Sequence, residues 1–350
     1  MIDNVIEQAI RLGASDIHIT ENKVVLYRVL GELRSAENFV FANKDIDEIL
    51  QRFCKGISRQ ELTEQGYDFS FTHSERRLRG HVALGMSGVS IYLRLLNDKI
   101  ATIDELGLPD TLYDIARAND GLFLVTGPTG SGKSTSLAAI VEEINMNRRL
   151  NVITIEDPIE YIYQEKMARI EQREVGEHVS DFSSAVRETL RQDPDVVLVG
   201  ELRDYETIDN ALILAETGHL VLGTLHARSV VETIERMISV FPESRRDEAH
   251  LSIINVLRGV MYQRLVNTKD FKRTPICEVM VLNDPIRSLL KDKKSKNTVR
   301  DAIRSEKTKG NIHMVDYSID LYRKGIVDIK ELEKELDPDD FEFFKKVNRL

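Results

Sequence analysis

The chain has 350 residues, of which 30% are charged and 42% hydrophobic, and it carries a formal net charge of −10 at pH 7. This length predicts more than one domain, and the acidic balance argues against a nucleic-acid partner. Two cysteines exclude both a disulfide framework and a four-cysteine zinc site. The first residues carry acids and lack a basic leader, so we expect no signal peptide. No apolar run is long enough for a transmembrane helix, so we expect no direct membrane insertion.

Residues 1–98 are predicted to form an α+β domain. Helical spacing of apolar residues indicates helices, and shorter alternating or apolar runs indicate strands. The predicted helices are 2–12, 44–54 and 58–65, and the predicted strands are 16–19, 23–29, 67–71, 76–84 and 89–96. Gly107 and Pro109 then interrupt the pattern, which predicts a linker over 99–111.

From Leu112 the pattern changes to strands that alternate with helices. The predicted strands are 121–126, 151–155, 196–200 and 220–224. This alternation is typical of a mostly parallel sheet covered by helices, and it predicts a core domain over 112–270. Beyond Pro242 the sequence is interpreted as helical to its end, apart from the short apolar run 276–282. Residues 271–350 are therefore predicted to be a mostly helical extension.

A phosphate-binding loop is the strongest motif in the chain. The sequence GLFLVTGPTGSGKST contains a short apolar strand, the pattern G-x-x-x-x-G-K-S and the start of a helix. Glycines let several backbone N–H groups face one anion, and the helix adds its positive end. Lys133 would contact the β- and γ-phosphates, and the Ser134 hydroxyl would ligate Mg²⁺. The predicted nucleotide-binding residues are Gly127, Pro128, Thr129, Gly130, Ser131, Gly132, Lys133, Ser134 and Thr135.

Acidic residues follow two of the other predicted strands. Strand 151–155 is followed by Glu156, Asp157 and Glu160, and the apolar residues 196–199 are followed closely by Glu201. Carboxylates at the carboxyl edge of a parallel sheet can orient water for attack on a phosphate or hold Mg²⁺. The alternative interpretation is a solvated strand end, where acids are common.

Two histidines flank the last predicted strand of the core. His219 and His226 are seven residues apart, so in an ideal strand they point to opposite faces and do not share a metal. His219 could contact a γ-phosphate, or it could have a purely structural role, and the sequence leaves both interpretations open.

These motifs, in this order and spacing, resemble those of the secretion ATPases of the type II secretion and type IV pilus superfamily. The resemblance is carried by the segments GPTGSGKST, ITIEDPIEY, QREVG, LRQDPDVVLVGELRDYET and AETGHLVLGTLHA. It extends to GASDIHI near the start, and EVMVLNDPIRSLLKDKK and GNIHMVDYSIDLYRKGIV resemble the C-terminal part of the PilT-type retraction ATPases. The resemblance implies a PAS-like N-terminal domain and a RecA-like P-loop core with a helical extension.

The resemblance also implies roles for individual residues. Glu160 would activate the attacking water, Glu201 would hold Mg²⁺, and His219 would sense the γ-phosphate, with His226 second in the same motif. The implied phosphate-contacting arginines are Arg79, Arg94 and, at a subunit junction, Arg203. One departure is the strand Arg77-Leu78-Arg79-Gly80-His81, which lacks the asparagine of the family pattern R-x-R-x-N.

The implied activity is that of an ATP- and Mg²⁺-dependent homo-hexameric motor that retracts type IV pili. Its partner would be the inner-membrane platform protein of the pilus machine, which would hold a cytoplasmic protein at the inner face of the membrane. The nearest alternative is an assembly-type ATPase for pili, competence or secretion. Such ATPases often carry an additional N-terminal domain and a four-cysteine zinc module, whereas Cys277 stands alone in its part of this sequence. A nucleic-acid motor and a nucleotide-binding scaffold without hydrolysis are the remaining alternatives.

Overall fold

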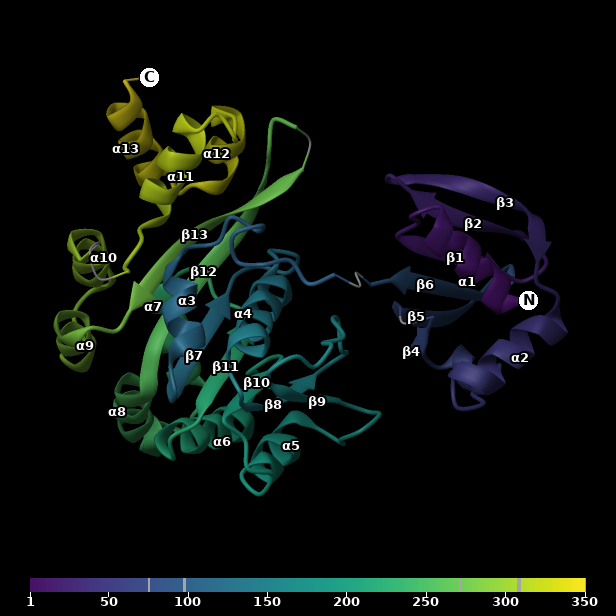
Figure 1. Ribbon diagram of the computed structural model, residues 1–350, viewed down its shortest axis with the longest axis horizontal. Helices are drawn as coiled ribbons and strands as arrows, with labels where there is room; N and C mark the ends of the chain where they lie inside the picture. The colour runs from purple at the N-terminus through teal and green to yellow at the C-terminus, as the bar shows by residue number, and fades with distance from the viewer. Residues whose placement is uncertain (75, 97–98, 271, 307–309, 350) are drawn as a thin grey trace. The chain divides into compact units, whose positions relative to one another are not determined.

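The computed structural model describes residues 1–74, 76–96, 99–270, 272–306 and 310–349. It separates into two compact units (Figure 1). The first unit consists of Met1–Lys99 together with Glu160–Ile162, and the second of Ile100–Ile159 and Tyr163–Leu350.

The first unit is an antiparallel sheet covered by helices. Within the described residues the sheet has the strand order β3-β2-β1-β6-β5-β4. Its strands are β1 (Asp16–Thr20), β2 (Val24–Val29), β3 (Glu32–Val40), β4 (Tyr67–His73), β5 (Arg76–Gly85) and β6 (Gly88–Leu95). The helices are α1 (Ile2–Arg11), α2 (Asn43–Phe53) and the short 3₁₀ helix η1 (Glu61–Thr63). The predicted α+β character of this region is confirmed.

Apolar side chains on one face of this sheet pack against α1 and α2. Ile17, Ile19 and Ile91 are fully buried with Ile6 of α1 and Ile46 of α2. The prediction of a helix over 58–65 is wrong, because this stretch contains only the 3₁₀ turn Glu61–Thr63. The reason is local, because the Glu61 carboxylate accepts hydrogen bonds from the backbone N–H and the hydroxyl of Ser58 and so closes a turn.

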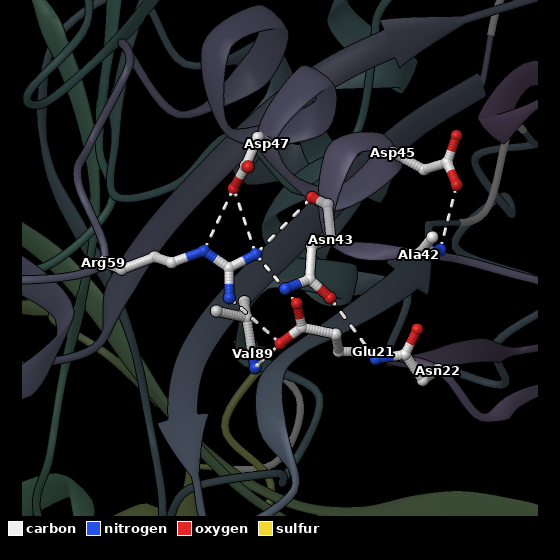
Figure 2. A network of polar contacts seen from close by, with 8 residues as sticks. All are labelled: Glu21, Asn22, Ala42, Asn43, Asp45, Asp47, Arg59 and Val89. Atoms are coloured by element: carbon white, nitrogen blue, oxygen red, sulfur yellow. Dashed lines mark hydrogen bonds and ion pairs between the residues drawn. The ribbon is translucent and has the colours of Figure 1, made fainter.

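A buried ion pair joins three parts of the first unit (Figure 2). The Glu21 side chain, only 6% exposed, accepts two hydrogen bonds from Arg59, at 2.9 and 3.0 Å. It also accepts one from the backbone N–H of Val89, at 3.1 Å, and Arg59 in turn contacts Asp47 on α2. A Cβ atom at Gly88 would lie 2.1 Å from the Glu21 carboxylate, so only glycine fits there. The pair thus links the β1–β2 turn, α2 and the start of β6.

The second unit is built on a mixed sheet with the order β13-β12-β7-β11-β10-β8-β9 among the described residues. Strands β12, β7, β11, β10, β8 and β9 run parallel to their neighbours, and β13 is antiparallel to β12. The strands are β7 (Gly121–Thr126), β8 (Asn151–Glu156), β9 (Arg169–Glu174), β10 (Val196–Val199), β11 (Leu220–Leu225), β12 (Leu257–Asn267) and β13 (Arg273–Val281).

Helices cover both faces of this sheet. The helices are α3 (Thr111–Arg117), α4 (Lys133–Asn147), α5 (Phe182–Thr189), α6 (Tyr205–Glu216), α7 (Val230–Ser239), η2 (Glu243–Arg245), α8 (Arg246–Val256), α9 (Asp284–Lys291), α10 (Lys296–Ser305), α11 (Met314–Arg323), α12 (Ile329–Glu335) and α13 (Pro338–Asn348). Leu122 and Leu124 of β7 point into the core shared with α5, α6, α7 and α8. Helix α4 packs on β7 and β11, with α3 beside it (Figure 1). The predicted α/β class is confirmed.

The interpretation of everything beyond Pro242 as helical, apart from one apolar run, is wrong. Residues Leu257–Asn267 form β12, which lies between β7 and β13 in the interior of the sheet. The preceding helix α8 ends at Val256, and the chain enters the sheet directly afterwards. Pairing with distant strands decides the conformation here, and a local helical pattern does not reveal it. Strand β9 was likewise not predicted.

Candidate active site

The phosphate loop connects β7 to α4 at the carboxyl edge of the parallel strands. Gly127 and Gly132 have φ angles of 149° and 86°, which residues with a side chain rarely adopt. Lys133 opens α4, and its ammonium group donates to the carbonyl oxygens of Gly127 and Pro128 at 3.2 and 3.1 Å. The strand, the glycine-rich turn and the helix N-terminus therefore have the arrangement that binds phosphate.

A side chain that the sequence reasoning missed supports this loop. Gln263 on β12 is 1% exposed, and its amide donates to the Ser131 carbonyl at 2.5 Å. The same amide accepts from the Ser136 hydroxyl at 2.8 Å. The stretch 257–266 contains three polar residues, Arg258, Gln263 and Arg264, so nothing in the sequence distinguishes Gln263, and the helical interpretation of this stretch concealed its place on a strand.

Glu201 lies at the same edge of the sheet, directly beyond β10. Its carboxylate is 18% exposed, contacts Arg203 at 2.5 Å and lies 3.5 Å from the Nε2 atom of His226, which directly follows β11. Burial opposes ionisation of Glu201. The hydrogen bond from Arg203 and the nearby charges of Arg203, His226 and Lys133 outweigh this effect and hold the pKa of the carboxyl below its usual range. Glu201 is thus an anion at neutral pH.

His219 lies at the opposite edge of the sheet. It precedes β11, and its carbonyl accepts from the N–H of Gly121 at the start of β7. Its ring nitrogen Nδ1 is 2.9 Å from the Leu214 carbonyl. The six residues of β11 separate it from the loop edge, about 20 Å at 3.3 Å per residue. The structure does not bring His219 to this chain's own phosphate loop, and it places His226 there instead.

Strand β8 brings Glu156 to the same carboxyl edge. Glu156 ends β8 and accepts hydrogen bonds from Thr154 at 2.7 Å and Gln172 at 3.3 Å. Glu160 is half-buried in the following connection and lies in the segment Glu160–Ile162, which belongs to the first unit. Its role in activating water stays a prediction.

Arg79 and Arg94 face each other across β5 and β6 of the first unit. The Nε atom of Arg94 donates to Asp16 on β1 at 2.9 Å, while 69% of the Arg94 side chain stays exposed. Burial of Asp16 is outweighed by hydrogen bonds from Ser15 and Arg94, which lower the pKa of its carboxyl. The sequence predicted the two arginines on adjacent strands but did not identify Asp16 as the anchor of Arg94.

A triphosphate and a magnesium ion suit the residues of the second unit. A Cβ atom at Gly127 would lie 2.3 Å from the Gln263 carbonyl oxygen, so only glycine lets the loop close against β12. Ser134 and Glu201 offer two oxygen ligands, and no cluster of three His, Cys, Asp or Glu side chains for a metal occurs in the described ranges. A metal held by few protein oxygens and by phosphate is typical of Mg²⁺.

The family is established by comparison with known proteins. A family model described as "Type II/IV secretion system protein" matches residues 1–316. The chain belongs to the type II/IV secretion system protein family. It is 35% identical to the type IV pilus retraction ATPase PilT of Pseudomonas aeruginosa over 317 residues, which cover 90% of each chain. It is also 37% identical to the uncharacterized protein YggR of Escherichia coli over 296 residues, which cover 84% of this chain and 90% of that one.

A solved structure agrees with this assignment. The crystal structure of the pilus retraction motor PilT with bound ADP matches with a TM-score of 0.86 and 36% sequence identity, over 97% of this chain and 98% of that one. The predicted RecA-like ATPase fold of the secretion family is thereby confirmed. None of the helices in the described ranges is long and apolar enough to span a bilayer.

Proposed function

We propose that this member of the secretion family is an ATP-hydrolysing motor that drives type IV pilus retraction. One observation carries the proposal: Glu201 and His226 converge at the sheet edge that presents the phosphate loop, in a chain that matches a retraction motor over nearly its whole length. Bound ATP would supply the scissile phosphoanhydride, and Mg²⁺ would add divalent charge at its phosphates.

The residues of the second unit would hold and polarise the phosphates. Lys133 would exchange its two loop carbonyl partners for phosphate oxygens, with the loop N–H groups around them. Ser134 and Glu201 would hold Mg²⁺, and the lowered pKa of Glu201 keeps it charged for this role. Arg203 and His226 fix the carboxylate in place. We assign to His226 the γ-phosphate role that the family resemblance implies for His219.

Glu160, Arg79 and Arg94 have further roles in this proposal. Glu160 is proposed to take a proton from the attacking water. Arg79 and Arg94 are proposed to contact phosphate, because an arginine held at its Nε atom by Asp16 can offer its outer nitrogens to an anion. Homo-hexamer formation, an inner-membrane platform protein as partner and a cytoplasmic location at the membrane belong to the same proposal.

Deletion of the gene tests the direction of the motor. Loss of a retraction motor leaves pili on the surface and abolishes twitching, whereas loss of an assembly-type ATPase leaves no pili. We expect surface pili without motility, restored by the wild-type gene and not by Lys133→Ala. Absence of surface pili in the deletion strain would replace retraction by the assembly alternative.

A further inference from the structure

We infer that Gln263 is a positioning residue that sets the phosphate loop in its anion-binding conformation from the neighbouring strand. This inference rests on the proposed function, in which the loop binds ATP. Gln263 would not touch the nucleotide. It acts through the backbone of the loop, which it contacts at both ends.

The side chain of Gln263 fixes one peptide plane of the loop. Its Nε2 atom donates to the Ser131 carbonyl at 2.5 Å. A trans peptide directs its C=O and its N–H to opposite sides. With the Ser131 carbonyl tied toward β12, the N–H of Gly132 points away from the strand, where it can contribute to an anion cradle.

The amide itself is held in one orientation. Its oxygen accepts from the hydroxyl of Ser136, in the first turn of α4, at 2.8 Å. Both Gln263 and Ser136 are buried, with 1% and 2% exposure. Because the oxygen is occupied by a donor, the nitrogen must face the carbonyl of Ser131. Rotation of the amide would place its oxygen against that carbonyl, which is unfavourable in a dry environment.

The backbone of Gln263 supports the other end of the loop. Its carbonyl oxygen lies 2.3 Å from the position of a Cβ on Gly127, and its Nε2 lies 3.2 Å from that of a Cβ on Gly132. The register of the parallel pair explains this position, since Tyr262 is paired with Thr126, the last residue of β7. Two of the three loop glycines, Gly127 and Gly132, therefore pack directly against one residue of β12.

Nucleotide affinity of the purified full chain tests the inference. Gln263→Met keeps the length of the side chain and removes the donor. We expect dissociation constants for ATP with Mg²⁺ and for ADP with Mg²⁺ about tenfold higher than wild type, which corresponds to about 1.4 kcal/mol. KM for ATP should rise by a similar factor while kcat stays within about twofold, because loop contacts hold substrate and transition state alike.

Two further variants distinguish positioning of the phosphate loop from an effect of side-chain charge and from a general loss of stability. Gln263→Glu keeps the acceptor for Ser136 and loses the donor to Ser131, so it should weaken binding at least as much. Gln192→Met is a matched control, because Gln192 lies near the amino end of β8, where its carbonyl accepts from the Asn151 side chain. It should bind both nucleotides like wild type.

Wild-type nucleotide affinity in a folded Gln263→Met protein would overturn the inference. A loss of affinity in Gln263→Glu but not in Gln263→Met would also overturn it, because it would show an effect of the added charge. If Gln263→Met does not fold, Ser136→Ala is measured instead; about threefold weaker binding is expected from a looser amide, and unchanged binding overturns the inference. Failure of the wild-type chain itself to bind ATP would instead refute the proposed function.

Discussion

Gly127→Ala offers a quantitative test of the loop geometry. The added methyl would lie 2.3 Å from the Gln263 carbonyl oxygen and 2.7 Å from the Ser131 hydroxyl oxygen. The carbonyl belongs to the backbone of an interior strand and cannot rotate away. Loop and strand must therefore separate by about 1 Å, an overpacking that costs about 1 to 3 kcal/mol.

Gly130→Ala is the matched control, because its φ angle of 76° is also left-handed but a Cβ there meets nothing within 4 Å. Its cost is the backbone strain alone, about 1 kcal/mol. Gly127→Ala combines the backbone strain with the overpacking against β12, at a total cost of about 3 kcal/mol. If these costs fall on the ATP-binding conformation of the loop alone, ATP affinity decreases about a hundredfold in Gly127→Ala and about fivefold in Gly130→Ala.

Calorimetric titration with ATP and Mg²⁺ measures the two affinities, and urea unfolding shows whether the strain stays within the loop or reaches the whole fold. Equal losses of affinity in the two variants, with unchanged unfolding, would refute the claim that contact with β12 sets the conformation of the loop.

Three more predictions concern ionisable side chains. Arg203→Ala removes the main favourable contact of the Glu201 carboxylate, so the acidic limb of the pH–rate profile should move to higher pH; an unmoved limb would show that Arg203 does not tune it. Glu21→Gln should lower the free energy of unfolding by about 2 to 4 kcal/mol in urea titrations. The hydrogen bond from its arginine partner outweighs burial and holds the pKa of Glu21 below 4.5, so the wild-type advantage should be full above that pH and vanish as pH falls through the folded-state pKa. His226→Ala should reduce kcat about tenfold or more whereas His219→Ala should not, and the reverse order would restore the original assignment.

Local motifs made the central part of the site predictable. The phosphate loop is a contiguous stretch whose glycines, lysine and flanking elements can be identified without knowledge of the rest of the chain. Glu201 followed from the direction of its strand, because a residue just beyond a parallel strand lies at the carboxyl edge. The same rule applied to β11 places His226, and not His219, at that edge.

Long-range pairing explains what the sequence did not reveal. Strand β12 follows α8 without a turn signal, and only its pairing with β7 and β13 shows that it is a strand. The contact of Gln263 with the loop depends on that pairing, so it could not be derived from spacing. Asp16 is a similar case, since its contact with Arg94 joins residues that lie 78 positions apart.

Magnesium-dependent ATP hydrolysis by the purified chain is the decisive measurement for this active site. We expect turnover in the wild type, a loss of about a hundredfold or more in Glu201→Gln, and retained turnover in His219→Ala. Hydrolysis that survives Glu201→Gln unchanged, or that needs no divalent cation, would contradict the assignment of this sheet edge as the active site.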